Sequence, residues 1–335
     1  MEMMKAAIFP EPKCVQLKEV PLPQPGAGEV LLKTKACAIC GSDKWLWQSG
    51  YQNIEDIQGH EGAGEVVKCG PGVTRFKPGD RVAILCIVGC GKCRECLSGN
   101  PTFCEEAWCV TRQYAEYSVV PERSLVPVPD DIPFELACLI TDSMGTPGRA
   151  VRRSEAGEGD LAAVLGCGPI GLNCIQLLRA ANVAVVAVDP EGYRREMALQ
   201  LGAYAALDPA QGDVVEQIYE LTDGGTDFAF ECSGKAGREA LRAARRGGTV
   251  AFVGECPTLQ ISPSDDFLRR QIELFGTWYL SEADYYENIE LVRAGRVDPR
   301  RIVTHTLPFT EIAKGFEYFV EHKEKCIKVV LRFGE

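Results

Sequence analysis

Four cysteines lie close together in one short segment of the chain. They are Cys90, Cys93, Cys96 and Cys104, at intervals of three, three and eight residues. Such a set of thiols supports two kinds of chemistry: disulfide pairing, which needs an oxidising compartment, or a tetrahedral metal site, which needs reduced thiols. Cys86 and Cys109 flank the four, so either of them is an alternative ligand.

The rest of the sequence favours the metal. The N-terminus, MEMMKAAIFPEPK, shows no long apolar core and no small-residue cleavage site, and no apolar run reaches the roughly 18 residues of a membrane span. We therefore expect a cytoplasmic protein with reduced thiols. Because four thiolates leave zinc no open position, the spacing predicts a structural zinc site.

A second group of possible metal ligands lies upstream. The segment ACAICGSD supplies Cys40, Ser42 and Asp43, and the segment GHEGAGEV supplies His60 and Glu61. A thiol, an imidazole and carboxylates are all ligands that zinc accepts in proteins.

A glycine-rich turn predicts a dinucleotide site. Gly166, Gly168 and Gly171 form the pattern G-x-G-x-x-G, with Pro169 and Ile170 inside it, after an apolar strand and before an amphipathic helix. Asp189 ends the next apolar strand, 18 residues after Gly171. A carboxylate there accepts hydrogen bonds from ribose hydroxyls and repels a 2′-phosphate, which favours NAD over NADP. Arg194 and Arg195 weaken this preference without reversing it.

The elements that must position these groups lie in two regions of the chain with different sequence patterns. Up to about residue 132, short apolar-polar alternations are separated by Gly, Pro and Asp, as in an irregular β-barrel-like domain. From about residue 133, buried strands alternate with helices, which predicts a parallel sheet covered on both faces. The last 50 residues hold helices and a closing strand that pattern alone assigns to neither domain.

Size and charge narrow the range of functions further. The chain has 335 residues, which suggests two domains, and a net charge of −11. An acidic surface repels nucleic acid and anionic membranes, so we expect neither as a partner.

In order and spacing, the motifs CGSD, GHEGAGEV, GDRVA, the cysteine group, the glycine pattern, GGTVAFVG and THTLPFTEIAKGFE resemble the zinc-dependent medium-chain alcohol dehydrogenases. The resemblance covers nearly the whole chain. It implies an α/β plus β fold: a GroES-like irregular β barrel domain over 1–144 and 281–335, with a zinc lobe at about 86–109, and a Rossmann NAD-binding domain with a doubly wound parallel sheet over 145–280. The tail returns to the first domain.

The resemblance also implies roles for individual residues. Cys40, His60 and Asp142 match the ligands of a catalytic zinc, the second of two zinc ions in each chain. Taken alone, the segment TDSMG around Asp142 would be a helix cap and turn. Asp43 fixes the His60 ring, Glu61 lies beside the metal, and Ser42 takes the substrate's proton.

Other family positions are matched less closely. Family members often keep a basic residue near the cofactor pyrophosphate where Lys328 stands, and Trp45 and Trp47 are expected to wall the substrate pocket. The histidine that ends the proton relay in liver-type members is missing after Ser42, where the sequence reads DKWLWQSG.

The implied reaction moves a hydride between a secondary alcohol, such as a polyol, cyclitol or sugar-derived alcohol, and NAD, giving the ketone. The resemblance implies a homodimer or homotetramer. Three alternatives are a non-catalytic, zinc-stabilised NAD-binding regulatory protein, a primary alcohol or aldehyde dehydrogenase of the same family, and a reductase of unsaturated or quinone substrates. The quinone-type reductases usually lack both zinc sites, which counts against the third.

Overall fold

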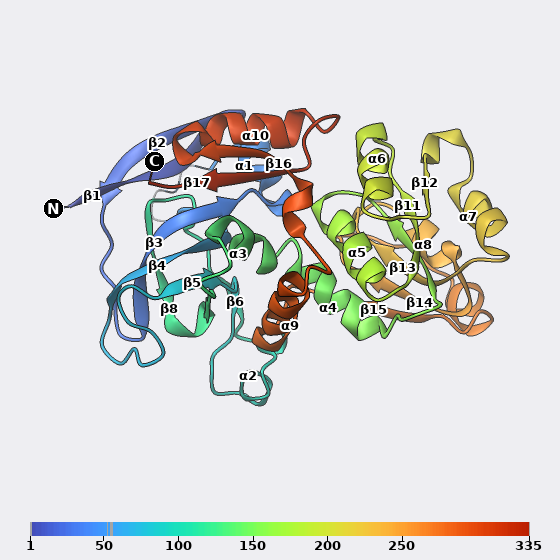
Figure 1. Ribbon diagram of the computed structural model, residues 1–335, viewed down its shortest axis with the longest axis horizontal. Coiled ribbons are helices and arrows are strands. Elements are labelled where there is room, and N and C mark those ends of the chain that lie inside the picture. The colour runs from blue at the N-terminus through green and yellow to red at the C-terminus, as the bar shows by residue number, and fades with distance from the viewer. Residues whose placement is uncertain (1, 52, 54–55, 335) are drawn as a thin grey trace. The chain divides into compact units, whose positions relative to one another are not determined.

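The computed structural model describes residues 2–51, 53 and 56–334 (Figure 1). The chain forms two compact units. The first comprises Met1–Asp142, Leu280–Tyr286 and Val303–Glu335, and the second comprises Ser143–Tyr279 and Glu287–Ile302. No helix in the described ranges is both long and apolar enough to cross a membrane.

The first unit is built on a sheet of seven strands. Six of them follow the order β16 (Val303–Pro308), β17 (Lys328–Arg332), β3 (Glu29–Ala38), β4 (Glu61–Cys69), β5 (Arg81–Ile84) and β9 (Leu125–Pro127), and β8 (Tyr117–Pro121) pairs with β3. Two smaller sheets accompany it: β1 (Met3–Glu11) with β2 (Cys14–Pro21), and β6 (Ile87–Val88) with β7 (Trp108–Cys109). The helices of this unit include α1 (Lys44–Ser49), α2 (Arg94–Leu97), α3 (Phe134–Ile140) and α10 (Ile312–Glu321).

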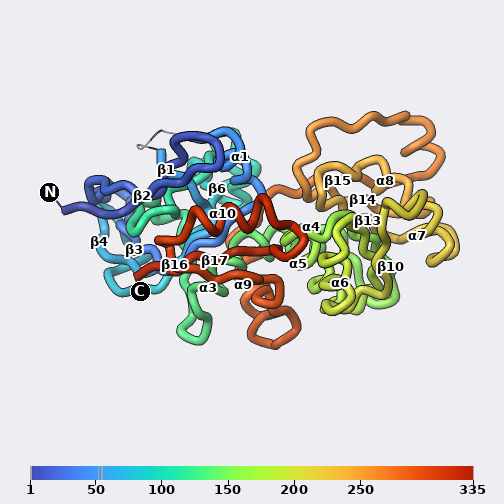
Figure 2. Tube along the Cα trace, turned by 90° about the horizontal axis from the view of Figure 1, so that it is seen from above, coloured from blue at the N-terminus to red at the C-terminus, as the bar shows by residue number. Residues whose placement is uncertain are grey.

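The C-terminal segment returns to this first unit. Strand β17 pairs antiparallel with β3, with Leu331 opposite Cys37, so the red and blue ends of the chain share one sheet (Figure 1). Helix α10 lies along β16 and β17 in both views (Figures 1 and 2). Its buried residues Ile312, Phe316 and Phe319 recur at helical spacing and join the core.

The second unit is a doubly wound α/β structure. Its six strands are all parallel, in the order β12 (Ala205–Leu207), β11 (Ala184–Val188), β10 (Leu161–Leu165), β13 (Thr226–Glu231), β14 (Ala244–Phe252) and β15 (Glu273–Gly276). This is the 3-2-1-4-5-6 order of the dinucleotide-binding fold. Its helices are α4 (Gly145–Ser154), α5 (Pro169–Ala180), α6 (Gly192–Gln200), α7 (Val214–Thr222) and α8 (Gly237–Ala243), and α9 (Glu282–Arg293) begins in the first unit and ends in the second.

The predicted fold class is confirmed, and the observed units divide the chain near the predicted boundaries but not at the same residues. The change of unit after Asp142 lies two residues from the expected boundary at 144. Residues 287–302, expected in the first domain, pack with the second instead. Arg152 of α4 explains the difference, because it binds the Glu287 carboxylate at 2.9 Å and the Asn288 side-chain oxygen at 3.0 Å.

Candidate functional site

The four closely spaced cysteines form one sulfur cluster around the short helix α2. The Sγ atoms of Cys90, Cys93, Cys96 and Cys104 all lie within 4.8 Å of one another. Main-chain N–H groups point at the sulfurs: Cys93 N donates to Cys90 Sγ at 3.4 Å, and Cys90 N donates to Cys104 Sγ at 3.3 Å. The backbone N–H groups of Lys92 and Cys93 lower the pKa of Cys90 to about 7, which favours the thiolate that binds metal.

Two further features define this cluster. A Cβ atom at Gly89 would lie 2.3 Å from Cys96 Sγ, so only glycine leaves room for that sulfur. Cys86 and Cys109, the alternative ligands, stand outside the cluster and hydrogen-bond to each other. The arrangement fits a closed tetrahedral metal site with four sulfur ligands.

A second cluster lies where three elements of the first unit end or begin. Cys40 follows β3, His60 precedes β4, Glu61 is the first residue of β4, and Asp142 follows α3. One donor atom from each of these four lies within 4.8 Å of the others. Asp142 Oδ2 is 3.5 Å from Cys40 Sγ and 3.3 Å from His60 Nε2. Helix α4 begins after Met144, so Asp142 lies two residues before the residue at its N-cap position.

The spacing of these donors suits a zinc ion. Ligands at 2.0–2.3 Å from a tetrahedral zinc lie about 3.3–3.8 Å apart, and the two Asp142 distances match that separation. Glu61 Oε2 is buried and has no hydrogen-bond partner, although it belongs to the cluster. A buried carboxylate oxygen without a partner is costly unless a cation or a proton is nearby. The residues therefore fit the metal.

The charges of the cluster also call for a cation. Burial, followed by the charges of Asp142 and Glu61, raises the pKa of Cys40 to about 11. Burial alone would lower the pKa of His60, but Asp43, Cys40 and Asp142 together raise it well above 6.5. Without a metal the site thus takes up protons, whereas a divalent ion would replace them and leave Cys40 as a thiolate and His60 neutral.

Two neighbouring side chains complete the surroundings of His60. Asp43 Oδ1 lies 3.5 Å from His60 Nδ1, and Ser42 Oγ lies 3.4 Å from His60 Nε2. Asp43 is 4% exposed, so its carboxylate is removed from water. The sequence prediction placed Asp43 beside the His60 ring, and the structure brings these two side chains together.

Lys328 makes contacts that the sequence prediction did not include. Its Nζ atom donates to Glu61 Oε1 at 2.6 Å and to the Ile39 carbonyl at 3.0 Å, and Lys328 is 1% exposed. Burial raises the pKa of Glu61 to about 7 even though Lys328 opposes the shift. A buried carboxylate needs a counter-charge, so Lys328 belongs to the metal-binding cluster, and its contact with a cofactor pyrophosphate stays a prediction.

The two tryptophans of α1 have different environments. Trp47 is in the core of the first unit, stacked on Phe316 at 6.4 Å, and its indole N–H donates to Glu321 Oε1 at 2.8 Å. The Trp47 ring therefore has a packing role in the core, and its expected place in the wall of a substrate pocket stays a prediction. Trp45 is 41% exposed and meets Tyr51 edge-on, so it remains a candidate pocket residue.

The glycine-rich turn has the geometry of a phosphate-binding loop. Gly166 has φ +98°. Gly171 lies so close to it that a Cβ added to Gly171 would be 1.8 Å from the Gly166 carbonyl oxygen. A Cβ on Gly168 would meet nothing within 4 Å, which leaves its backbone open to a ligand. Helix α5 begins at Pro169 and continues through Ile170, so its N-terminus, the end of a helix that binds anions, adjoins the glycine-rich turn.

Asp189 stands beside this turn at the end of β11. Its Oδ2 atom accepts the Cys167 N–H at 2.7 Å, and its Oδ1 atom accepts the Glu191 N–H at 2.8 Å. Each carboxylate oxygen has a second lone pair for a ribose hydroxyl. Of the nearby arginines, Arg195 is bound to Asp208 at 2.8 Å, whereas Arg194 Nε is buried without a hydrogen-bond partner.

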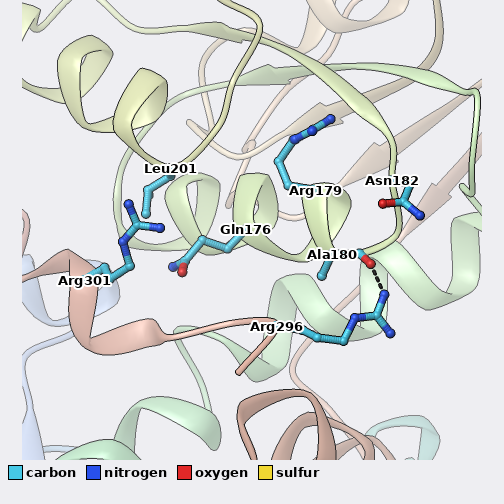
Figure 3. A pocket seen from close by; sticks show the side chains of 7 residues that line it. All are labelled: Gln176, Arg179, Ala180, Asn182, Leu201, Arg296 and Arg301. Atoms are coloured by element: carbon cyan, nitrogen blue, oxygen red, sulfur yellow. Dashed lines mark hydrogen bonds between the residues drawn. The ribbon is translucent and has the colours of Figure 1, made fainter. Parts of the chain in front are cut away.

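Three arginines are among the residues that line a cavity of about 440 Å³ in the second unit (Figure 3). Arg179, Arg296 and Arg301 each donate to main-chain carbonyls near the ends of α5 and α6, namely those of Val183, Ala180 and Gln200. Cations at helix C-termini stabilise the helix dipole, which accounts for these side chains. Their guanidinium groups point in different directions (Figure 3).

The sequence prediction missed Tyr114. Its hydroxyl group donates to Asp43 Oδ2 at 2.6 Å, although 71 residues separate the two. A tyrosine in an alternating strand pattern resembles any other core aromatic residue, so no local pattern could have identified this contact.

Comparison with known proteins agrees with this structure. Residues 26–130 match the family model described as "Alcohol dehydrogenase GroES-like domain", and residues 169–294 match "Zinc-binding dehydrogenase". L-threonine 3-dehydrogenase of Caldanaerobacter subterraneus subsp. tengcongensis is 36% identical over 337 residues, which cover 92% of this chain and 93% of the relative. Sorbitol dehydrogenase of Bacillus subtilis is 31% identical over 344 residues, which cover 98% and 97%.

Among solved structures, a proposed zinc-binding dehydrogenase of Sinorhizobium meliloti 1021 was determined bound to NADP. It superposes with a TM-score of 0.86 at 28% identity, over 99% of this chain and 100% of the other. These matches span both units. The chain therefore belongs to the zinc-dependent medium-chain alcohol dehydrogenases and is an NAD(P)-dependent oxidoreductase that acts on CH–OH groups.

Proposed function

We propose that this protein oxidises a secondary alcohol to the ketone with NAD, at a zinc ion held by Cys40, His60 and Asp142. The observation that carries the proposal is the buried cluster of these three residues with Glu61, next to Ser42. The four cysteines Cys90, Cys93, Cys96 and Cys104 would hold a second, structural zinc.

Each residue of the proposed zinc site has its own role in the oxidation of the alcohol. When bound, zinc would polarise the substrate oxygen and NAD would accept the hydride. The thiolate of Cys40 and the carboxylate of Asp142 balance the charge of the ion. Asp43 keeps the proton of His60 on Nδ1, so that Nε2 is free to bind. Ser42 Oγ, 3.4 Å from His60 Nε2, takes the proton of the substrate hydroxyl group and passes its own hydroxyl proton outward. Lys328 holds Glu61 by its Oε1 atom.

The substrate class rests on the relatives. The printed names of two relatives are L-threonine 3-dehydrogenase and sorbitol dehydrogenase, and the substrates in those names carry secondary hydroxyl groups. A polyol, cyclitol or sugar-derived alcohol is therefore our proposed class.

A panel of secondary alcohols and polyols tests this directly. We expect reduced NAD to accumulate with at least one member of the panel, and metal analysis to give two zinc ions per chain. Cys40→Ala should remove one zinc and the activity together, whereas Cys14→Ala, which alters a cysteine outside both clusters, should remove neither. Turnover of primary alcohols alone would overturn the proposed substrate class.

The preference for NAD depends on Asp189. Asp189→Gly removes the negative charge that would repel a 2′-phosphate. It also removes two hydrogen bonds to the ribose of NAD. The KM for NAD should therefore rise by about ten- to a hundredfold, while NADP improves relative to NAD. Steady-state kinetics with both cofactors measure this shift. Asp223→Gly is the matched control, because Asp223 has φ +52° at the end of α7 and glycine suits that conformation. A wild-type enzyme that prefers NADP would already contradict the assignment.

We also propose that the protein is a cytoplasmic homodimer or homotetramer. Cysteines that bind zinc must be reduced, and the two clusters together hold five of them, which suits a reducing compartment. Strand β15 ends the parallel sheet, and Leu274 on it and Trp278 just after it are 42% and 49% exposed. An exposed edge strand with apolar side chains is suited to pairing with a second copy. Light scattering under reducing conditions should give a multiple of the chain mass, and a monomer would contradict the proposal.

A further inference from the structure

Tyr114 is a fully buried tyrosine whose hydroxyl group reaches the metal-binding cluster of the first unit. It is 0% exposed, and its Oη atom donates a 2.6 Å hydrogen bond to Asp43 Oδ2. The other oxygen of that carboxylate, Oδ1, lies 3.5 Å from His60 Nδ1. A line of polar contacts therefore runs from Tyr114 through Asp43 to His60.

The ring of Tyr114 is held in place without help from its hydroxyl group. The ring meets Phe316 edge-on at 5.6 Å, and main-chain hydrogen bonds to Gln58 and Ala7 fix the backbone on either side. Gly59 has φ +94°, and a Cβ there would lie 2.8 Å from the Tyr114 ring. A phenylalanine would pack in the same space, so packing does not explain the hydroxyl group.

The hydrogen bond from Tyr114 has a consequence for the proton on His60. Burial, and then the charge of Asp43, raise the pKa of Tyr114 well above 10, so the phenol keeps its proton and always donates. One Asp43 oxygen is engaged by this donor, and the plane of the carboxylate is fixed. The other oxygen then faces His60 as an acceptor, which favours the tautomer with the proton on Nδ1.

We propose that Tyr114 is a positioning residue of the metal site: its hydroxyl group orients the Asp43 carboxylate, and Asp43 in turn presents His60 Nε2 as a metal ligand. This inference rests on the proposed zinc site at Cys40, His60 and Asp142. Partners that orient a metal-binding histidine typically change metal affinity by about 10- to 100-fold, and Tyr114 acts one contact further out.

Tyr114→Phe tests the inference on the zinc-loaded full chain. We expect one of the two zinc ions to leave to EDTA about tenfold faster than in the wild type, at the low end of that range, with the other unchanged. The absorption bands of cobalt(II) in the catalytic site should also shift, which a loss of stability alone would not cause. Tyr285→Phe is the matched control, since Tyr285 is also 0% exposed in the first unit and donates to the Pro127 carbonyl at 2.9 Å. Its zinc ions should leave at wild-type rates.

A second variant tests whether Tyr114 acts through Asp43. Asp43→Asn can still accept the Tyr114 hydrogen bond but turns an N–H toward His60, so zinc should leave faster by a similar factor. Adding Tyr114→Phe to Asp43→Ala should then change nothing further. Zinc loss and cobalt spectra in Tyr114→Phe that equal those of Tyr285→Phe would overturn the role of Tyr114. One zinc per chain in the wild type, unaffected by Cys40→Ala, would instead overturn the proposed function and this inference with it.

Discussion

Asp142→Asn is expected to lower turnover about a hundredfold or more while leaving NAD binding nearly intact. An amide is a neutral and weaker ligand than a carboxylate, so the cluster with Cys40 and His60 would carry one extra positive charge and bind zinc more loosely. NAD binding should persist because the glycine-rich turn belongs to the second unit. Metal analysis, cofactor titration and turnover measured on the same preparation separate these effects.

Asp142→Cys sharpens this prediction. A thiolate keeps the negative charge and suits zinc, so the metal should be retained and part of the activity should survive. Asp130→Asn is the matched control, because Asp130 is an exposed aspartate of the same unit, and its turnover should equal that of the wild type. Two zinc ions and near-normal turnover in Asp142→Asn would show that the third ligand is another residue, and Glu61 would be the first to test.

Cys96→Ala is expected to remove one zinc per chain and to destabilise the first unit. A closed site with four sulfur ligands contributes its binding free energy to folding, so its loss should lower the melting temperature by roughly 10 °C. The remaining zinc should stay in place, because the two clusters share no ligand. Differential scanning calorimetry and metal analysis provide the two measurements.

Two further variants test the prediction for the cysteine cluster. Cys109→Ala changes a cysteine of the same segment that lies outside the cluster, so it should keep both zinc ions. Gly89→Ala should resemble Cys96→Ala, since its Cβ would occupy the position of the Cys96 sulfur. Unchanged zinc content and melting temperature in Cys96→Ala would contradict a structural metal site.

The sequence alone determined the features whose parts are close together along the chain. The four cysteines lie within 15 residues, and the loop around α2 brings them together whatever the rest of the fold does. The glycine pattern is likewise local: the conformation of Gly166 and the close packing of Gly171 are properties of one strand-turn-helix unit. Asp142 was different, because its segment alone suggested a helix cap and only the resemblance to a family singled it out.

The tertiary structure decided which distant side chains meet in the buried interior. Lys328 pairs with Glu61 across 267 residues, and Tyr114 reaches Asp43 across 71. Trp47 lies in the core because α10 and its Phe316 pack against it. A buried charge or hydroxyl group must find a partner, but its burial and its neighbours depend on how β17, β3 and β4 assemble. No local pattern carries that information, since it arises only when the strands pair.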